Sequence, residues 1–175
     1  MFSFKGKSFV LALALMFLFG LFSCSSKSYK NGVFSDDENS YRILPPSANW
    51  KQLNAEGADI AFFNEKLNAV IMLNSTCEKY KDAPASALSG HLVIGIEDKK
   101  VIEQEKIEVD GREAVYTVLE GMLDGASVKL VTLVLVKNYC IYDMAYSASP
   151  RNFKKGLPAF KKIMAKFKVL SRKGQ

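Results

Sequence analysis

Four strand-like segments between residues 101 and 148 constrain the fold more than any other part of the chain. They span residues 101–109, 112–123, 127–136 and 139–147. Asp-Gly pairs at 110–111 and 124–125 separate the first three segments, and Lys137-Asn138 separates the last two. An Asp-Gly pair between apolar alternations favours a type I′ turn, because glycine accepts a positive φ. The sequence therefore predicts a four-stranded antiparallel meander.

The strands of this meander differ in how they alternate. Residues 128–136 read VKLVTLVLV, which is apolar at nearly every position. That pattern is typical of a strand covered on both faces. Residues 101–109 instead alternate, with Glu103, Glu105 and Glu108 among the apolar residues, and this predicts one solvated face. Upstream, 60–63 and 69–73 predict a hairpin, and a short strand at 41–44 ends before Pro45-Pro46.

Two segments show helical spacing. Leu88, Leu92 and Ile96 recur at intervals of four and predict a helix over 85–96, which Gly90 and Gly95 weaken. The second predicted helix covers 149–167, capped by Ser149, and we expect Gly156 and Pro158 to kink or split it. Its apolar stripe consists of Phe153, Leu157, Phe160, Ile163, Met164 and Phe167. We expect one α+β domain, a twisted antiparallel sheet of about six to seven strands with helices packed on its faces.

The N-terminal segment reads as an export signal. Lys5 and Lys7 precede an apolar run at 9–22, which is shorter than the roughly 20 residues of a membrane-spanning helix. Leu21-Phe22-Ser23-Cys24 resembles the lipobox of bacterial lipoproteins, although Phe22 stands where that family prefers a small residue. The resemblance implies cleavage after residue 23 and acylation of Cys24. The alternative is an uncleaved apolar anchor.

These features predict four regions along the chain. They are a signal peptide at 1–23, a flexible tether at 24–38, the domain at 39–170 and a basic tail at 171–175. The net charge of +6 includes the two lysines of the leader, so the mature chain carries +4, which is too modest for a nucleic-acid footprint. Ser25 after the cysteine matches the sorting rule of enteric bacteria. We therefore expect an envelope protein, lipid-anchored to the outer membrane and facing the periplasm.

Several diffuse patterns resemble the PsbP/Mog-like superfamily. They are Tyr41-x-Ile43-x-x-Pro46-x-x-x-Trp50, Val109-Asp110-Gly111-Arg112-Glu113-Ala114, Asp124-Gly125, Tyr139 to Tyr146 and the Phe153/Phe160/Phe167 helix. The resemblance covers roughly residues 33 to 170. It implies an antiparallel sheet with helices on its faces and brings no active-site signature. The bacterial exported members of that superfamily are uncharacterised, so the resemblance implies a fold and no specific function.

Cys77 and Cys140 are candidates for a disulfide. Export places them where disulfides persist, and Cys77 ends one predicted strand while Cys140 begins another. If those strands are antiparallel neighbours, the two thiols meet. Two separate buried thiols and a metal or redox site are the alternatives. The chain has no CxxC pair, and its single histidine, His91, could not complete a zinc site without a carboxylate.

Five residues are candidates for a ligand or partner surface. They are Trp50, Tyr142, Tyr146, Lys161 and Lys162. Core packing is the alternative for the three aromatic residues, and a solvated helix face is the alternative for the two lysines. The lysines flank the apolar stripe of the second helix, where they could also contact anionic lipid head groups.

The functional expectation is a non-catalytic interaction or accessory domain. The strand-turn-helix setting of a G-x-S-x-G nucleophile is missing from the sequence, so we predict no enzyme activity, no cofactor and no metal. The expected partners are the membrane, through the lipid, and another envelope protein, with no nucleic acid. The alternative is a binder of a small apolar or anionic ligand held between sheet and helix.

Overall fold

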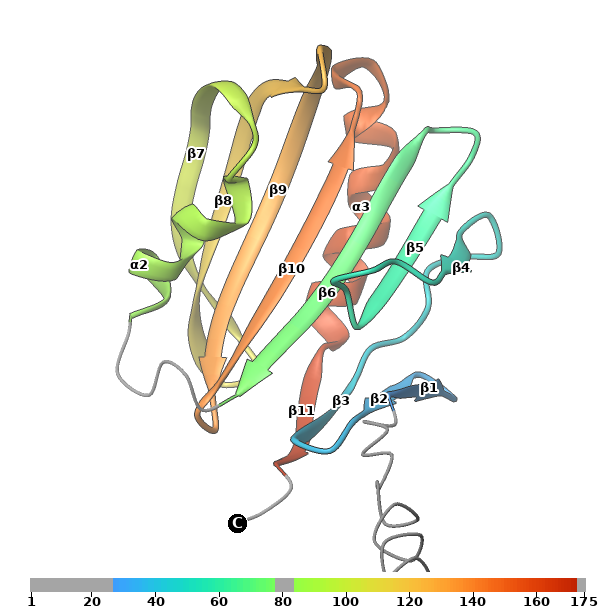
Figure 1. Cartoon of the computed structure of the whole chain (residues 1–175), viewed down its shortest axis with the longest axis vertical. Coiled ribbons are helices and arrows are strands. Elements are labelled where there is room, and N and C mark those ends of the chain that lie inside the picture. The colour runs from blue at the N-terminus through green and yellow to red at the C-terminus, as the bar shows by residue number, and fades with distance from the viewer. Residues whose placement is uncertain (1–26, 78–83, 173–175) are drawn as a thin grey trace, which may run out of the picture.

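The computed structural model describes residues 27–77 and 84–172, which form two antiparallel sheets and two helical segments (Figure 1). The strands of the larger sheet follow the order β4-β5-β6-β10-β9-β8-β7, and those of the smaller sheet β1-β2-β3-β11. The elements are β1 (Ser28–Lys30), β2 (Val33–Ser35), β3 (Asn39–Arg42), β4 (Lys51–Leu53), β5 (Ile60–Asn64), β6 (Ala69–Cys77), α2 (Ala85–Leu88), η2 (Ser89–Val93), β7 (Glu97–Val109), β8 (Arg112–Leu123), β9 (Ala126–Lys137), β10 (Cys140–Ala148), α3 (Pro150–Lys166) and β11 (Lys168–Arg172). The α+β prediction is confirmed.

The predicted meander is β7 to β10. Asp110 and Gly111 have φ values of 50° and 70°, and Asp124 and Gly125 have 49° and 75°, as a type I′ turn requires. The third turn lies one residue later than predicted. Asn138 and Tyr139 hold its positive φ angles, so β10 begins at Cys140 rather than at Tyr139.

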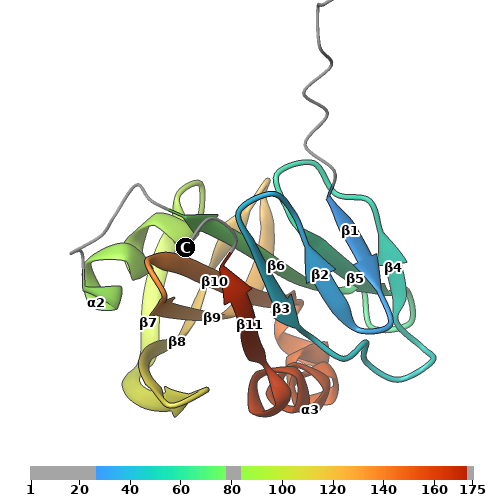
Figure 2. The ribbon, with the colours of Figure 1, turned by 90° about the horizontal axis from the view of Figure 1, so that it is seen from below.

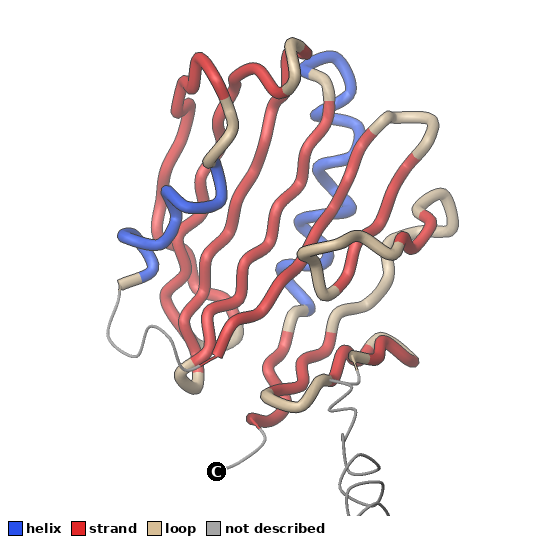
Figure 3. The backbone as a smooth tube through the Cα atoms, in the orientation of Figure 1, coloured by secondary structure: helices blue, strands red, loops and turns tan. Residues whose placement is uncertain are grey.

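The two faces of the larger sheet are covered unequally (Figure 3). On one face, α3 packs across β6, β9 and β10. There Phe153 and Phe160 lie against Tyr146 of β10, with ring centroids 5.3 and 6.0 Å away. On the other face, α2 and η2 cover only β8 and β9, together with the Cys140 end of β10. Leu88 of α2 packs on Val134 and Ile141, and a second small cluster joins Ile96, Leu119 and Leu130.

Burial along the meander confirms one prediction and corrects another. The middle of β9 is buried on both faces, as its apolar run predicts. In contrast, β7 is exposed from Glu97 to Lys106 on both of its faces, so the predicted half-buried strand is wrong. The reason is position, because β7 is the edge strand and neither helical layer reaches across it.

The helices also depart from the sequence predictions. The predicted helix over 85–96 is one α-helical turn followed by the 3₁₀ segment η2, and Gly95 leaves the segment with a φ of 89°. The longer helix, α3, continues without interruption through Gly156 and Pro158, so the predicted split is wrong. At Gly156 the backbone of α3 comes so near the sheet that a Cβ atom there would overlap the Tyr146 hydroxyl.

The predicted tether at 24–38 is wrong for residues 28–38, because this segment contains strands β1 and β2 of the smaller sheet. These strands form because Tyr29 and Phe34 find buried aromatic partners, Phe62 and Tyr41 respectively. The predicted strand at 41–44 occupies 39–42 instead. At the other end, Ser171 and Arg172 of the predicted tail belong to β11, where they pair with β3. Residues 1–26 and 173–175, which include Cys24, lie outside the described residues.

Cys77 and Cys140 form the predicted disulfide. They are direct partners in the β6–β10 register, with an S–S distance of 2.07 Å and a Cα–Cα distance of 4.0 Å. The bond therefore ties together the two central strands that support α3. None of the helices in the described part of the chain has the length and apolar character needed to cross a membrane.

Candidate functional site

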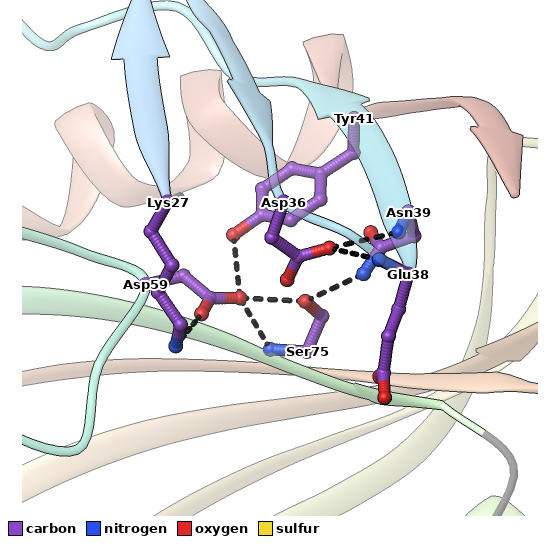
Figure 4. Close-up of polar contacts among 7 residues, drawn as sticks. All are labelled: Lys27, Asp36, Glu38, Asn39, Tyr41, Asp59 and Ser75. Atoms are coloured by element: carbon purple, nitrogen blue, oxygen red, sulfur yellow. Dashed lines mark hydrogen bonds and ion pairs between the residues drawn. The ribbon is translucent and has the colours of Figure 1, made fainter. Parts of the chain in front are cut away.

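A buried polar network fastens the smaller sheet to the larger one (Figure 4). At its centre is the side chain of Asp59, which is 0% exposed and directly precedes β5. Its Oδ2 accepts hydrogen bonds from the Ser75 amide (2.8 Å), the Ser75 hydroxyl (2.5 Å) and the Tyr41 hydroxyl (3.2 Å). Lys27 donates to Oδ1 at 2.9 Å. The network thus joins the residue before β1 to strands β3 and β6.

The electrostatics of this network keep its donors protonated. The hydrogen bond to Asp59 raises the pKa of Lys27, so the ammonium stays charged. Burial, and then the charge of Asp59, raise the pKa of Tyr41, so its hydroxyl remains a donor. Asn39 extends the network by donating to the Ser75 hydroxyl at 3.1 Å. Because these hydrogen bonds join the two sheets, we interpret the network as a structural fastening, in which Asn39 Oδ1 alone is left without a partner among the described residues.

A second fastening lies at the first Asp-Gly turn. Asp110 Oδ2 accepts hydrogen bonds from Lys137 Nζ (2.8 Å) and from the Val169 amide of β11 (2.9 Å). Burial acts to raise the pKa of Asp110, but these two hydrogen bonds, together with the positive charges of Lys137 and Lys168, outweigh it and the pKa is lowered. The carboxylate therefore connects the meander to the smaller sheet in its charged form.

The outer face of α3 carries only positive charges. We define it as the exposed cations of that helix: Arg151, Lys154, Lys155, Lys161, Lys162 and Lys166. The helix contains no acidic residue, and no ion pair among the described residues involves it. Its buried side, with Phe153, Phe160 and Ile163, holds the helix on the sheet.

A shallow groove lies on the opposite face of the sheet, which only α2 and η2 partly cover. This open-face groove has a volume of about 260 Å³ and runs between residues 56–58 and Leu92 of η2. Met72 and Ala145 form its floor beside Asn74 and Asp143. Met72 is 42% exposed. Thr132 is the register partner of Ala145 on this face, and among the described residues its buried hydroxyl has no hydrogen-bond partner.

Another groove, of about 310 Å³, separates the edge strand β7 from α3. Glu103, Glu105 and Glu108 line one side and Lys161 the other, with Tyr116 between them. Burial, followed by the charges of Glu103 and Glu105, raises the pKa of Tyr116. The groove is therefore an acidic border beside the basic face of α3.

The structure does not bring the five predicted surface residues together. Trp50, Tyr142 and Tyr146 are buried in the main core, so their prediction as a surface is wrong and their core-packing alternative is confirmed. Trp50 packs edge-on against Tyr146, and Tyr142 packs against Tyr41 and Phe167. Lys161 and Lys162 are exposed on α3 as predicted. The side chain of His91 lies outside the described residues.

The sequence interpretation missed the Asp59 network. Its members are far apart in the chain, since Tyr41, Asp59 and Ser75 belong to three different strands or loops. The one available signal was the acidic residue immediately before the apolar run of β5, at Asp59-Ile60-Ala61. Within the described residues, no three metal-ligating side chains converge.

Comparison with solved structures places this architecture among known folds. CyanoP, the cyanobacterial PsbP of Synechocystis sp. PCC 6803, has a TM-score of 0.58 at 13% identity, over 86% of this chain and 96% of its own. LpqN of Mycobacterium tuberculosis, described as involved in cell envelope biogenesis, has a TM-score of 0.61 at 11% identity, over 84% and 91%. A Pseudomonas aeruginosa protein of unknown function has 0.50 at 16% identity, over 81% and 94%.

These likenesses show the fold, which is PsbP-like, as the sequence motifs predicted. At identities between 11% and 16% they carry no residue roles. No protein-family model matches the sequence, and no curated protein matches it.

Proposed function

We propose that this chain is a bacterial envelope lipoprotein, acylated at Cys24 and held at the outer membrane on its periplasmic side. Its PsbP-like domain binds another envelope protein and carries out no chemistry of its own. The observation that carries this proposal is how close the folded domain begins to Cys24, because Lys27 is already ion-paired to the buried Asp59. Only residues 25 and 26 separate it from the cysteine of the lipobox-like motif.

This short connection suits a membrane-attached domain. Three residue steps from Cys24 to Lys27 span at most about 11 Å when fully extended. Acyl chains add roughly 0.8 kcal/mol of membrane affinity per buried methylene, so a lipoprotein with several chains stays attached. The Cys77–Cys140 disulfide supports an exported location, since such bonds persist in oxidising compartments. The likeness to LpqN, itself described as acting in envelope biogenesis, agrees with this location.

Mass spectrometry of the protein from native membranes tests the anchor. We expect a mature chain that begins at Cys24 and carries acyl groups. The Cys24→Ser variant should leave the membrane fraction, whereas the matched Ser26→Ala variant should remain there. A membrane-bound chain that still begins at Met1 without acyl groups would instead mean an uncleaved apolar anchor and would refute the proposal.

The open-face groove supports a second candidate function, the binding of a small apolar ligand. Its lining combines the exposed Met72 and Ala145 of the floor with Leu92 of η2, and such ligands favour an apolar lining of this kind. Dodecanoate is a suitable probe. Binding should raise the Tm of the wild-type protein, and Met72→Trp should abolish the rise by filling the groove. The control variant Leu123→Trp, at a similarly exposed site on the β8–β9 turn, should keep it. An unchanged wild-type Tm would exclude dodecanoate as a ligand.

A further inference from the structure

We propose that the outer face of α3 docks the acidic surface of another protein, on the side of the domain that points away from the anchoring membrane. This inference rests on the proposed lipid anchor and names the docking surface and the chemistry of the partner. Three observations carry it: the charge of α3, its rigid seat, and its position relative to the start of β1.

No ion pair in the described chain neutralises the cations of α3, although Glu103, Glu105 and Glu108 line the groove opposite Lys161. Elsewhere in the described chain, five lysines are paired with acids, among them Lys106 (2.9 Å from Glu113), Lys129 (2.7 Å from Glu120) and Lys137 (2.8 Å from Asp110). Other exposed cations, such as Lys30 and Lys100, take part in no ion pair with a described residue either. The cations of α3 take part in no ion pair of this kind among the residues that the structure describes. A surface of one sign attracts a surface of the other sign and orients it before contact.

The helix presents these charges on a rigid support. Phe153, Phe160 and Ile163 are buried beneath it, and Gly156 allows its backbone to approach Tyr146 closely. None of the large exposed hydrophobic side chains of the described domain belongs to α3. A face that is basic without being apolar favours an electrostatic contact that forms quickly and weakens as salt is added.

The start of the folded chain and the outer face of α3 lie on opposite sides of the molecule, although the smaller sheet packs on the same face of the larger sheet as α3. Lys27 pairs with Asp59, and residues 56–58 next to Asp59 form one wall of the open-face groove. Figure 2 shows β1 beginning on one side of the molecule and α3 on the other. With at most about 11 Å of chain between Cys24 and Lys27, the anchoring membrane lies on the open-face side. Head groups of that membrane are therefore not the occupant of the α3 face, and we assign it to a protein.

Site-specific photocrosslinking of the full-length lipoprotein in its native membranes tests this assignment. The photoreactive residue replaces Ala165, which is exposed among the cations of α3 and leaves their charge intact. Met72 on the opposite face is the matched control position. The test variant is Lys155→Glu/Lys162→Glu/Lys166→Glu, and its control for total charge is Lys30→Glu/Lys51→Glu/Lys100→Glu, all exposed residues outside α3.

We expect a protein adduct at position 165 and none of the same mass at position 72. Reversing the charge of α3 should reduce this adduct by about tenfold or more, while the control triple variant changes it by less than about twofold. Raising the salt concentration with the wild-type chain should weaken it as well, which does not depend on how any variant folds.

Three results would overturn the inference. A lipid adduct at position 165 would place α3 on the membrane, and an adduct of twice the mass of the chain would mean a second copy. A protein adduct that survives charge reversal would remove the electrostatic basis. Each of these can occur with Cys24 acylated, so the mass analysis of the N-terminus separates failure of this inference from failure of the proposed anchor.

Discussion

The two faces of the seven-stranded sheet are built on the same strands but are finished differently. One face is sealed by α3 through large aromatic contacts among Tyr146, Phe153 and Phe160. The other carries two small aliphatic clusters under α2 and η2, and it is open above Met72 and Ala145. The difference indicates that the face under α3 provides most of the packing energy. The face under α2 and η2 contributes less and retains a groove.

The largest expected effect is on the sealed face. Phe160→Ala should lower the free energy of unfolding by about 3–5 kcal/mol, because it removes a fully buried ring against Tyr146. Urea unfolding followed by circular dichroism measures the change. A loss below about 1 kcal/mol would show that α3 is not the principal cover of the sheet.

Loss of the disulfide should affect both faces, since β6 and β10 contribute residues to each. The double variant Cys77→Ala/Cys140→Ala should cost about 2–4 kcal/mol, because the bond closes a span of 63 residues in the unfolded chain. Unfolding of the wild-type protein with and without reductant provides the control. Identical midpoints under both conditions would contradict the bond.

A matched truncation on the open face should cost less. Leu88→Ala removes a side chain that packs on Val134 and Ile141 in a small cluster, and we expect a loss of about 2 kcal/mol. Hydrogen exchange should show faster opening of α2 and η2 with α3 still protected. If Leu88→Ala destabilised the protein more than Phe160→Ala, the ranking of the two faces would be reversed.

Asp110 predicts a pH dependence for the connection between the meander and β11. Its folded pKa is lowered, so its stabilisation is complete above the ordinary value of 3.8 and is lost as the pH falls below it. Asp110→Asn should cost about 1–2 kcal/mol at pH 7 and should flatten the loss of stability below about pH 4. If the free energies of unfolding of the wild-type and Asp110→Asn proteins fell in parallel below pH 4, this role of Asp110 would be refuted.

The smallest expected change is a gain. Thr132 lies on the open face of the sheet and is 1% exposed, and its hydroxyl lacks a partner among the described residues. Thr132→Val should therefore raise the free energy of unfolding by up to about 1 kcal/mol. Thr117→Val is the control, because Thr117 accepts a hydrogen bond from Gln104 at 3.0 Å and its loss should not stabilise. A destabilised Thr132→Val protein would mean that the hydroxyl has a partner.

The parts of the fold that depend on local chemistry could be predicted from the sequence. The Asp-Gly turns require a positive φ that two adjacent residues supply, and the stripe of α3 repeats along one helix. The overall class and the disulfide followed from the order of these elements. The length of the helix predicted over 85–96 did not follow from the sequence. Gly90 and Gly95 weaken that segment, and its packing on β9 ends with η2.

The parts that depend on distant partners were missed. Residues 24–38 have the composition of a tether, yet β1 and β2 form because Tyr29 and Phe34 meet Phe62 and Tyr41. The Asp59 network requires β3, β5 and β6 to be in place before its geometry exists. Of the candidate site, the cations of α3 could be recognised from the sequence. Their place on the opposite side from Lys27 could not, because it depends on how the two sheets pack.

Methionine oxidation by hydrogen peroxide tests the assignment of the two faces most directly. Met72 lies on the open face with 42% of its surface exposed. Met144 precedes Ala145, the register partner of Met72, and points beneath α3 with 1% exposed. Peptide mass spectrometry of the folded protein should show Met72 oxidised at least about tenfold faster than Met144, because reactivity follows access. Faster oxidation of Met144 would mean that β6 and β10 present the opposite faces, and it would contradict the account.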